Sequence, residues 1–189
     1  MLLTQTKPIL QETPESDEKA IAQAKEDPKA FEILYKKYYA EIFRFVDKKV
    51  MDKNDTADIV SRVFVKSFNQ IHHFQYKGIP YSAWLYRVAI NEANQYFNNS
   101  KTRHVVIDDH LSSSIAFELN TDHDKQQLID QLPAALNRLK PLEIELIELR
   151  FYEGMSYKQI GEILNMSENT SKVKTFRALK KLKKVMNNG

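Results

Sequence analysis

Hydrophobic positions along the first third of the chain recur at the spacing of a helix. Between Asp27 and Val50 an apolar side chain returns every three or four residues, at Phe31, Leu34, Tyr35, Tyr38, Ile42, Phe45 and Val46. Asp27 followed by Pro28 is typical of a helix start, because aspartate caps free amide groups and proline fits the first turn. The pattern predicts one long amphipathic helix over residues 28–50.

The same periodicity continues through most of the chain. A second helix is predicted from Asn54 or Asp55 to about residue 71, and a third over residues 80–99. After residue 124 the pattern predicts four shorter helices, over residues 128–139, 141–153, 157–164 and 168–186. No segment alternates polar and apolar residues over the length of a strand. The predicted fold class is all-α.

The polar stretches suggest how the helices are grouped. Residues 1–16 are poor in apolar side chains and are expected to be a flexible leader. Residues 102–123 are acidic, serine-rich and without a sustained period, and a structureless stretch of that length is unusual inside one domain. We therefore expect an extended acidic linker there, joining two small helical domains: one of three to four helices over residues 17–101, and one over residues 124–189.

Composition excludes several classes of site. The chain has 189 residues and no cysteine, which excludes disulfides, thiol nucleophiles and cysteine-ligated zinc and fits a reducing cytoplasm. Its 4 glycines are too widely spaced for a phosphate-binding loop. No uncharged apolar run is long enough to cross a bilayer, and the N-terminus lacks the features of a secretory signal.

Basic residues are concentrated at the C-terminal end. The net charge is only +3, yet residues 167–186 carry seven lysines and arginines against the single acidic residue Glu168. A basic helix on a slightly acidic body favours a polyanionic partner. The alternative from charge alone is a solvated lysine face.

Residues 157–182 have the features of a helix-turn-helix. Gly161 is the small residue that such a motif needs where its two helices cross. Asn165 tolerates the left-handed turn, and Ser167 can cap the second helix. The alternative is a plain three-helix bundle, but the coincidence of charge, small residue, turn and cap favours DNA binding.

The second helix of this motif supplies the candidate DNA contacts. Lysine and arginine can bind phosphates or guanine edges, and methyl groups or rings can pack on thymine methyls. The candidates are Thr170, Lys172, Val173, Lys174, Phe176, Arg177, Lys180 and Lys181.

Four segments, in order, resemble the extracytoplasmic-function (ECF) sigma factors of the bacterial sigma-70 family. They are AFEILY at 30–35, DTADIV at 55–60 with Val63-Phe64, WLYRVA at 84–89 with Asn91, and LRFYEGMSY at 149–157 followed by SENT at 167–170 and Arg177-Ala178. The resemblance covers about residues 18–101 and 125–186. It implies a transcription initiation factor without catalytic residues, cofactor or metal.

The resemblance also implies partners and contact residues. The helix matching residues 55–68 would bind the β′ clamp helices of core RNA polymerase through Asp55, Asp58, Ser61 and Arg62. Residues 71–99 would recognise and melt the promoter −10 element, with His72, His73, Phe74, Tyr76, Tyr81, Tyr86 and Asn91 as candidates. The helix-turn-helix would read the −35 element, and the β flap and an anti-sigma protein are further implied partners. The free protein would be a cytoplasmic monomer.

The chain departs from the family pattern at a few positions. Ser61 stands where a glutamine is usual and Glu92 where an apolar residue is usual. Ser171 and Thr175 occupy places that are normally apolar core positions on the recognition helix.

Two other interpretations have distinct consequences. A DNA-binding regulator that never contacts polymerase would form a stable dimer and bind duplex DNA tightly by itself. A nuclease would need clustered carboxylates, but the pairs Asp55/Asp58 and Asp108/Asp109 have no histidine or lysine at a spacing that completes a site.

Overall fold

The structure is a computed structural model that describes residues 14–75, 80–100, 114–115, 118 and 125–187. Within these ranges the regular elements are all helical, which confirms the predicted all-α class. The chain divides into two compact units, Met1–His104 and Val105–Gly189. No helix in the described ranges is long and apolar enough to cross a membrane.

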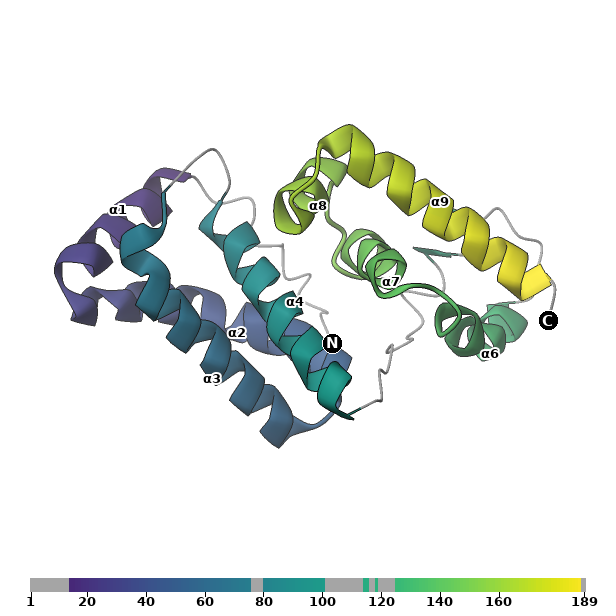
Figure 1. Cartoon of the computed structure of the whole chain (residues 1–189), viewed down its shortest axis with the longest axis horizontal. Coiled ribbons are helices and arrows are strands. Elements are labelled where there is room, and N and C mark those ends of the chain that lie inside the picture. Colours follow the sequence, from purple (N-terminus) through teal and green to yellow (C-terminus); the bar gives the residue numbers. More distant parts are fainter. Residues whose placement is uncertain (1–13, 76–79, 101–113, 116–117, 119–124, 188–189) are drawn as a thin grey trace, which may run out of the picture. The chain divides into compact units, whose positions relative to one another are not determined.

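The first unit is built around three long helices that pack on one another, with a fourth, α1, packed on α2 (Figure 1). Its α-helices are α1 (Pro14–Glu26), α2 (Phe31–Val50), α3 (Lys53–Gln70) and α4 (Tyr81–Ser100). Short 3-10 turns, η2 (Pro28–Ala30) and η3 (Ile71–His73), precede α2 and follow α3.

The helix starts follow the capping residues, with one correction. Asp27 accepts a hydrogen bond from the Lys29 backbone N–H at 2.9 Å, as expected at the start of the first predicted helix. The start of α3 was predicted at Asn54 or Asp55 but lies at Lys53. Asp52 is the cap, because Met51 turns the chain in the left-handed conformation and the Asp52 carboxylate accepts the N–H groups of Asn54 and Asp55.

Helix α1 lies where no helix was placed from the sequence, and it begins inside the segment expected to be a flexible leader. Its sequence signal is short, because its buried apolar face consists of only Ala20, Ile21 and Ala24. A buried polar contact supplements this face. Asp17 accepts hydrogen bonds from the Tyr38 hydroxyl at 2.5 Å and from Lys37 Nζ at 2.9 Å, both on α2.

From residue 125 to residue 187, the second unit is described as α-helices joined by loops and one π-helical turn (Figure 1). They are α6 (Lys125–Leu136), α7 (Pro141–Ile147), the π turn η4 (Glu148–Tyr152), α8 (Tyr157–Leu164) and α9 (Glu168–Asn187). As predicted, Ser156 caps α8, and Gln159 completes a capping box by accepting from the Ser156 N–H at 2.8 Å. Helix α9 packs on α6, α7 and α8.

One residue of the expected linker belongs to the core of the second unit. Ile115 is fully buried there, in a cluster with Leu132, Leu136, Leu139, Ile144, Ile147, Phe151, Leu179 and Leu182. Glu118, three residues later, is exposed. Ile115 lies within the segment expected to be an acidic linker, and its burial anchors that part of the segment to the second unit. The linker carboxylates Asp108, Asp109 and Asp122 lie outside the described residues.

Truncating this anchor should destabilise the second unit alone. We expect Ile115→Ala to lower its free energy of unfolding by about 2–5 kcal/mol, as for other buried isoleucines. The single tryptophan, Trp84, lies in the first unit, so its fluorescence in a denaturant titration reports that unit, whereas far-ultraviolet circular dichroism reports both. Glu118→Ala is the matched control. If the fluorescence and circular dichroism transitions of Ile115→Ala shift equally, or if neither shifts, Ile115 does not anchor the second unit.

Candidate nucleic-acid interface and partner-binding face

The crossing of α8 and α9 is held by a very close backbone approach. A Cβ atom placed on Gly161 would lie 2.6 Å from the carbonyl oxygen of Met166, closer than atoms tolerate. Asn165 adopts the left-handed conformation, with φ 56° and ψ 51°. Ser167 Oγ accepts the N–H of Thr170 at 3.1 Å and so caps α9. The helix-turn-helix predicted from these three residues is therefore confirmed.

The inward face of α9 is polar at two positions but fully satisfied. Ser171 and Thr175 are both completely buried. The Ser171 hydroxyl lies 2.6 Å from the carbonyl oxygen of Tyr157 on α8, and the Thr175 hydroxyl donates to the Ser171 carbonyl at 2.8 Å. Because their hydroxyls have acceptors, these residues can replace apolar ones without leaving a buried group unpaired. Their burial fixes the rotation of α9.

The outward face of α9 combines positive charge with exposed apolar groups. Val173 is 39% and Phe176 57% exposed, so two large apolar side chains lie on the solvent-facing side of the helix. The basic candidates around them are also exposed: Lys172, Lys174, Arg177 and Lys180. This face offers cations for phosphates together with a methyl pair and a ring for base edges.

Two of the predicted contact residues on α9 already have partners within the unit. Lys181 Nζ lies 2.7 Å from Glu143 Oε2 on α7. Partial burial is the largest single influence on the pKa of Glu143 and acts to raise it. The hydrogen bonds from Lys181 and from the Lys140 backbone N–H, with the charges of both lysines, together outweigh it, so the pKa lies below its usual value. The Thr170 hydroxyl is 2.8 Å from the capping Ser167 hydroxyl. Lys181 therefore attaches α9 to α7, and Thr170 takes part in the cap at the start of α9.

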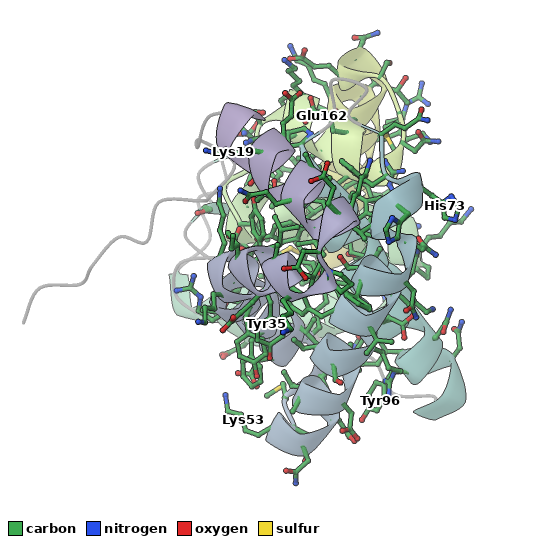
Figure 2. The ribbon with its side chains drawn as sticks, turned by 90° about the vertical axis from the view of Figure 1, so that its left-hand side faces the viewer. Lys19, Tyr35, Lys53, His73, Tyr96 and Glu162 are labelled. Carbon is green, nitrogen blue, oxygen red and sulfur yellow. The ribbon has the colours of Figure 1, made fainter. Side chains whose placement is uncertain are left out.

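In the first unit, α3 presents a polar face whose edge is bridged to α4. Asp58 and Ser61 are exposed, as predicted for a partner-binding face. Asp55 instead accepts a hydrogen bond from the Tyr96 hydroxyl at 2.6 Å, which is the main reason that the pKa of Tyr96 is raised. Figure 2 shows Tyr96 beside α3.

The other bridge explains the unusual carboxylate at position 92. Glu92 is only 3% exposed, and both of its oxygens are engaged. Arg62 Nε lies 3.2 Å from Oε2, and Lys66 pairs with Oε1. A buried carboxylate needs such partners, and α3 supplies both. The predicted contact residue Arg62 is thus half-exposed and oriented by α4.

The candidates for the −10 contact are divided between surface and core. His72, His73 and Asn91 are exposed. Tyr81 and Tyr86 are buried, which corrects their prediction as DNA contacts: the Tyr81 hydroxyl pairs with Ser67, and the Tyr86 hydroxyl donates to Glu41 at 2.6 Å. Burial is the main cause of the raised pKa of Tyr81. Tyr76 lies outside the described residues.

No group of three potential metal ligands occurs among the described residues, and His72-His73 is not part of one. Phe74 is half-buried against Tyr81 and Trp84, at ring distances of 5.4 and 5.6 Å.

A polar groove of about 460 Å³ runs between α3 and α4. It brings Asn91 together with side chains that were not predicted: Lys66, Gln70, Arg87, Asn94, Gln95 and Asn98. The signal was present in the sequence, because Asn91, Asn94 or Gln95, and Asn98 follow one another at helical spacing. Amides both donate and accept, so a row of them suits the edges of unpaired bases.

Comparison with known proteins finds two family matches, one in each unit of the chain. The sigma-70 region 2 family model matches residues 34–103 and the sigma-70 region 4 model matches residues 129–182. The ECF RNA polymerase sigma factor SigX of Bacillus subtilis is 28% identical over 166 residues, covering 82% of this chain and 83% of SigX. The ECF sigma-E factor of Haemophilus influenzae is 29% identical over 164 residues, covering 80% of this chain and 85% of that protein.

The chain belongs to the ECF group of the sigma-70 family. Sigma factors are promoter-specific initiation factors of RNA polymerase and, as a family, are not enzymes. The ECF factor BldN of Streptomyces coelicolor is 27% identical over 159 residues; the match covers 83% of this chain and 60% of BldN.

Solved structures support the fold assignment. CnrH, determined in complex with the cytosolic domain of CnrY, aligns with a TM-score of 0.59 at 20% identity. The alignment covers 89% of this ECF chain and 96% of CnrH. The helical fold of the chain is therefore that of CnrH.

Proposed function

We propose that this ECF factor binds core RNA polymerase through the first unit and reads the −10 and −35 promoter elements through the first and second units. The observation that carries the proposal is the pairing, in one chain, of an exposed polar face on α3 with a basic helix-turn-helix. A regulator that acts without polymerase needs no such face. The proposed domains are residues 17–101 and 124–189, with the linker between them.

The polymerase-binding face is centred on the middle of α3. Asp58 and Ser61 are exposed on it, and Val65, four residues further, is 55% exposed. These three residues offer charge, a hydroxyl and an apolar surface to the clamp helices of β′. Asp55 and Arg62 form the edge of the face, where Tyr96 and Glu92 hold them.

The DNA contacts are proposed by exposure and position. On α9, Lys172, Val173, Phe176 and Arg177 would face base edges, and Lys174 and Lys180 phosphates. In the first unit, His72, His73 and Asn91 would contact the −10 element, with the amide groove beside Asn91 receiving unpaired bases.

Further features of the proposal concern partners and location. We propose a cytoplasmic protein without catalytic activity, monomeric when free, that contacts the β flap and is bound by an anti-sigma protein. The structure of CnrH, which shares its fold, is a complex with the cytosolic domain of CnrY, so this fold accommodates a protein partner.

Run-off transcription from pooled genomic fragments tests the function. Bacterial core RNA polymerase should produce new, discrete transcripts only when the protein is added, because promoter selection is the proposed role. Retention of particular duplexes by the protein alone, with no new transcript, would instead support a regulator that acts without polymerase.

The rotation of α9 predicts unequal effects of two basic residues. Arg177→Ala should reduce transcription from a recovered promoter about 5–100-fold, since a good base contact contributes about 1–3 kcal/mol. Lys183→Ala should have a small effect, because Lys183 is partly buried beside the core face of α9. The measurement is run-off yield at fixed salt. Equal losses for the two variants would mean that α9 is rotated differently.

The proposed polymerase face predicts a charge-reversal effect. Asp58→Lys should weaken binding of core polymerase at least several-fold, because it reverses an exposed charge at the centre of the face. Affinity is measured by fluorescence anisotropy with labelled protein and core enzyme. Glu18→Lys, an exposed reversal on α1, is the control. Unchanged affinity for Asp58→Lys would place the interface elsewhere.

A further inference from the structure

Phe74 is the residue that fixes the exposed histidine pair in space. It directly follows His72 and His73 and is the first extended residue after η3, with φ −66° and ψ 124°. Its N–H group donates to the carbonyl oxygens of Gln70 and Ile71, at 3.1 and 3.2 Å. Its ring packs edge-on against Tyr81, at an interplanar angle of 88°. The amide is thus held by the end of α3 and by η3, and the ring is held by α4.

The remaining polar group of Phe74, its carbonyl, is held by the N-terminal helix. Lys25 Nζ, in the last turn of α1, donates a hydrogen bond to the Phe74 oxygen at 2.7 Å, between residues 49 positions apart in the chain. Lys25 is half-buried. A charged donor on a carbonyl makes a stronger hydrogen bond than a neutral one, and partial burial reduces competition from water.

Helix α1 is itself firmly attached to the first unit. Asp17 bonds Tyr38 and Lys37 on α2, and Ala20 and Ala24 are buried. The region 2 family model begins at residue 34, so α1 lies outside the matched segment. In this chain, therefore, α1 lies outside the region 2 match but bonds the backbone of Phe74, which directly follows the −10 candidates His72 and His73.

We propose that Lys25 is a positioning residue for −10 recognition: by holding the Phe74 carbonyl, it sets the place of His72 and His73 relative to Asn91 on α4. This proposal rests on the proposed function of the first unit. Without the lysine, the Phe74 peptide keeps its N–H bonds but loses the contact that fixes its carbonyl. The histidines then follow α3 alone, and promoter bases meet them in a less defined position.

The test compares three variants in run-off transcription with core polymerase. Lys25→Met keeps the aliphatic stem and removes the donor, Lys25→Arg restores a donor, and Lys19→Met changes an exposed lysine on the same helix (Figure 2). Each is assayed on a promoter recovered from genomic fragments and on single-base substitutions across its −10 element. Affinity for core polymerase is measured in parallel.

We expect Lys25→Met to lower transcription from the parent promoter about fivefold, the effect of one hydrogen bond. The preference for the parent −10 sequence over its substitutions should shrink with it, while core affinity stays unchanged. Lys25→Arg should recover most of both quantities, and Lys19→Met should match wild type.

Two results would overturn the proposal about Lys25 without affecting the proposed function. In the first, the Lys25→Met variant transcribes with wild-type yield and −10 preference. In the second, the affinity of the Lys25→Met variant for core polymerase falls in parallel with its transcription yield. The second would show that Lys25 only stabilises the unit. Wild-type protein that yields no transcript overturns the function on which the proposal rests.

Discussion

The close approach of the Met166 carbonyl oxygen to the backbone of Gly161 determines which face of α9 the second unit exposes. Only glycine permits that approach, and only a left-handed residue at Asn165 closes the turn that follows. Once α8 and α9 cross at this distance, Ser171 lies against the Tyr157 carbonyl and the outward face of α9 is fixed. The exposure of Val173 and Phe176 beside basic residues is a consequence of this crossing.

In the first unit, polar side-chain bridges fix α3 relative to α4, whereas in the second unit a close backbone approach sets the crossing of α8 and α9. Glu92, nearly buried, draws Arg62 and Lys66 of α3 toward α4, and Tyr96 does the same for Asp55. These bridges connect α3, which is proposed to bind polymerase, with α4, whose side chains form most of the lining of the polar groove. Such charge-assisted hydrogen bonds orient the side chains at the edge of the binding face before a partner arrives, which lowers the entropy lost on binding.

Attachment points outside the two family segments also shape the molecule. Ile115 joins the core of the second unit, and α1 joins the first through Asp17 and Lys25. Each is a single side chain or a short face, which periodicity over long windows does not detect. Both attachments depend on tertiary contacts. One is an isoleucine buried from within a polar stretch, and the other is a lysine that bonds a carbonyl 49 positions away.

Features that depend only on neighbouring residues could be predicted from the amino-acid sequence. Helical periodicity predicted α2, α4 and α9, and local chemistry predicted the caps at Asp27, Ser156 and Ser167 and the turn at Asn165. The order of short motifs was enough to indicate the sigma-70 family. These features are set within a few residues, because hydrogen bonding and side-chain spacing act at that range.

Which side chains of those helices are exposed and unpaired depends instead on how the helices pack. Tyr81 and Tyr86 share the aromatic character of good base-stacking residues, yet they are buried and bonded to Ser67 and Glu41. Lys181 resembles its neighbours on α9 but pairs with Glu143. Burial and pairing depend on which residues another helix brings opposite, and that is a property of packing between segments distant in the chain.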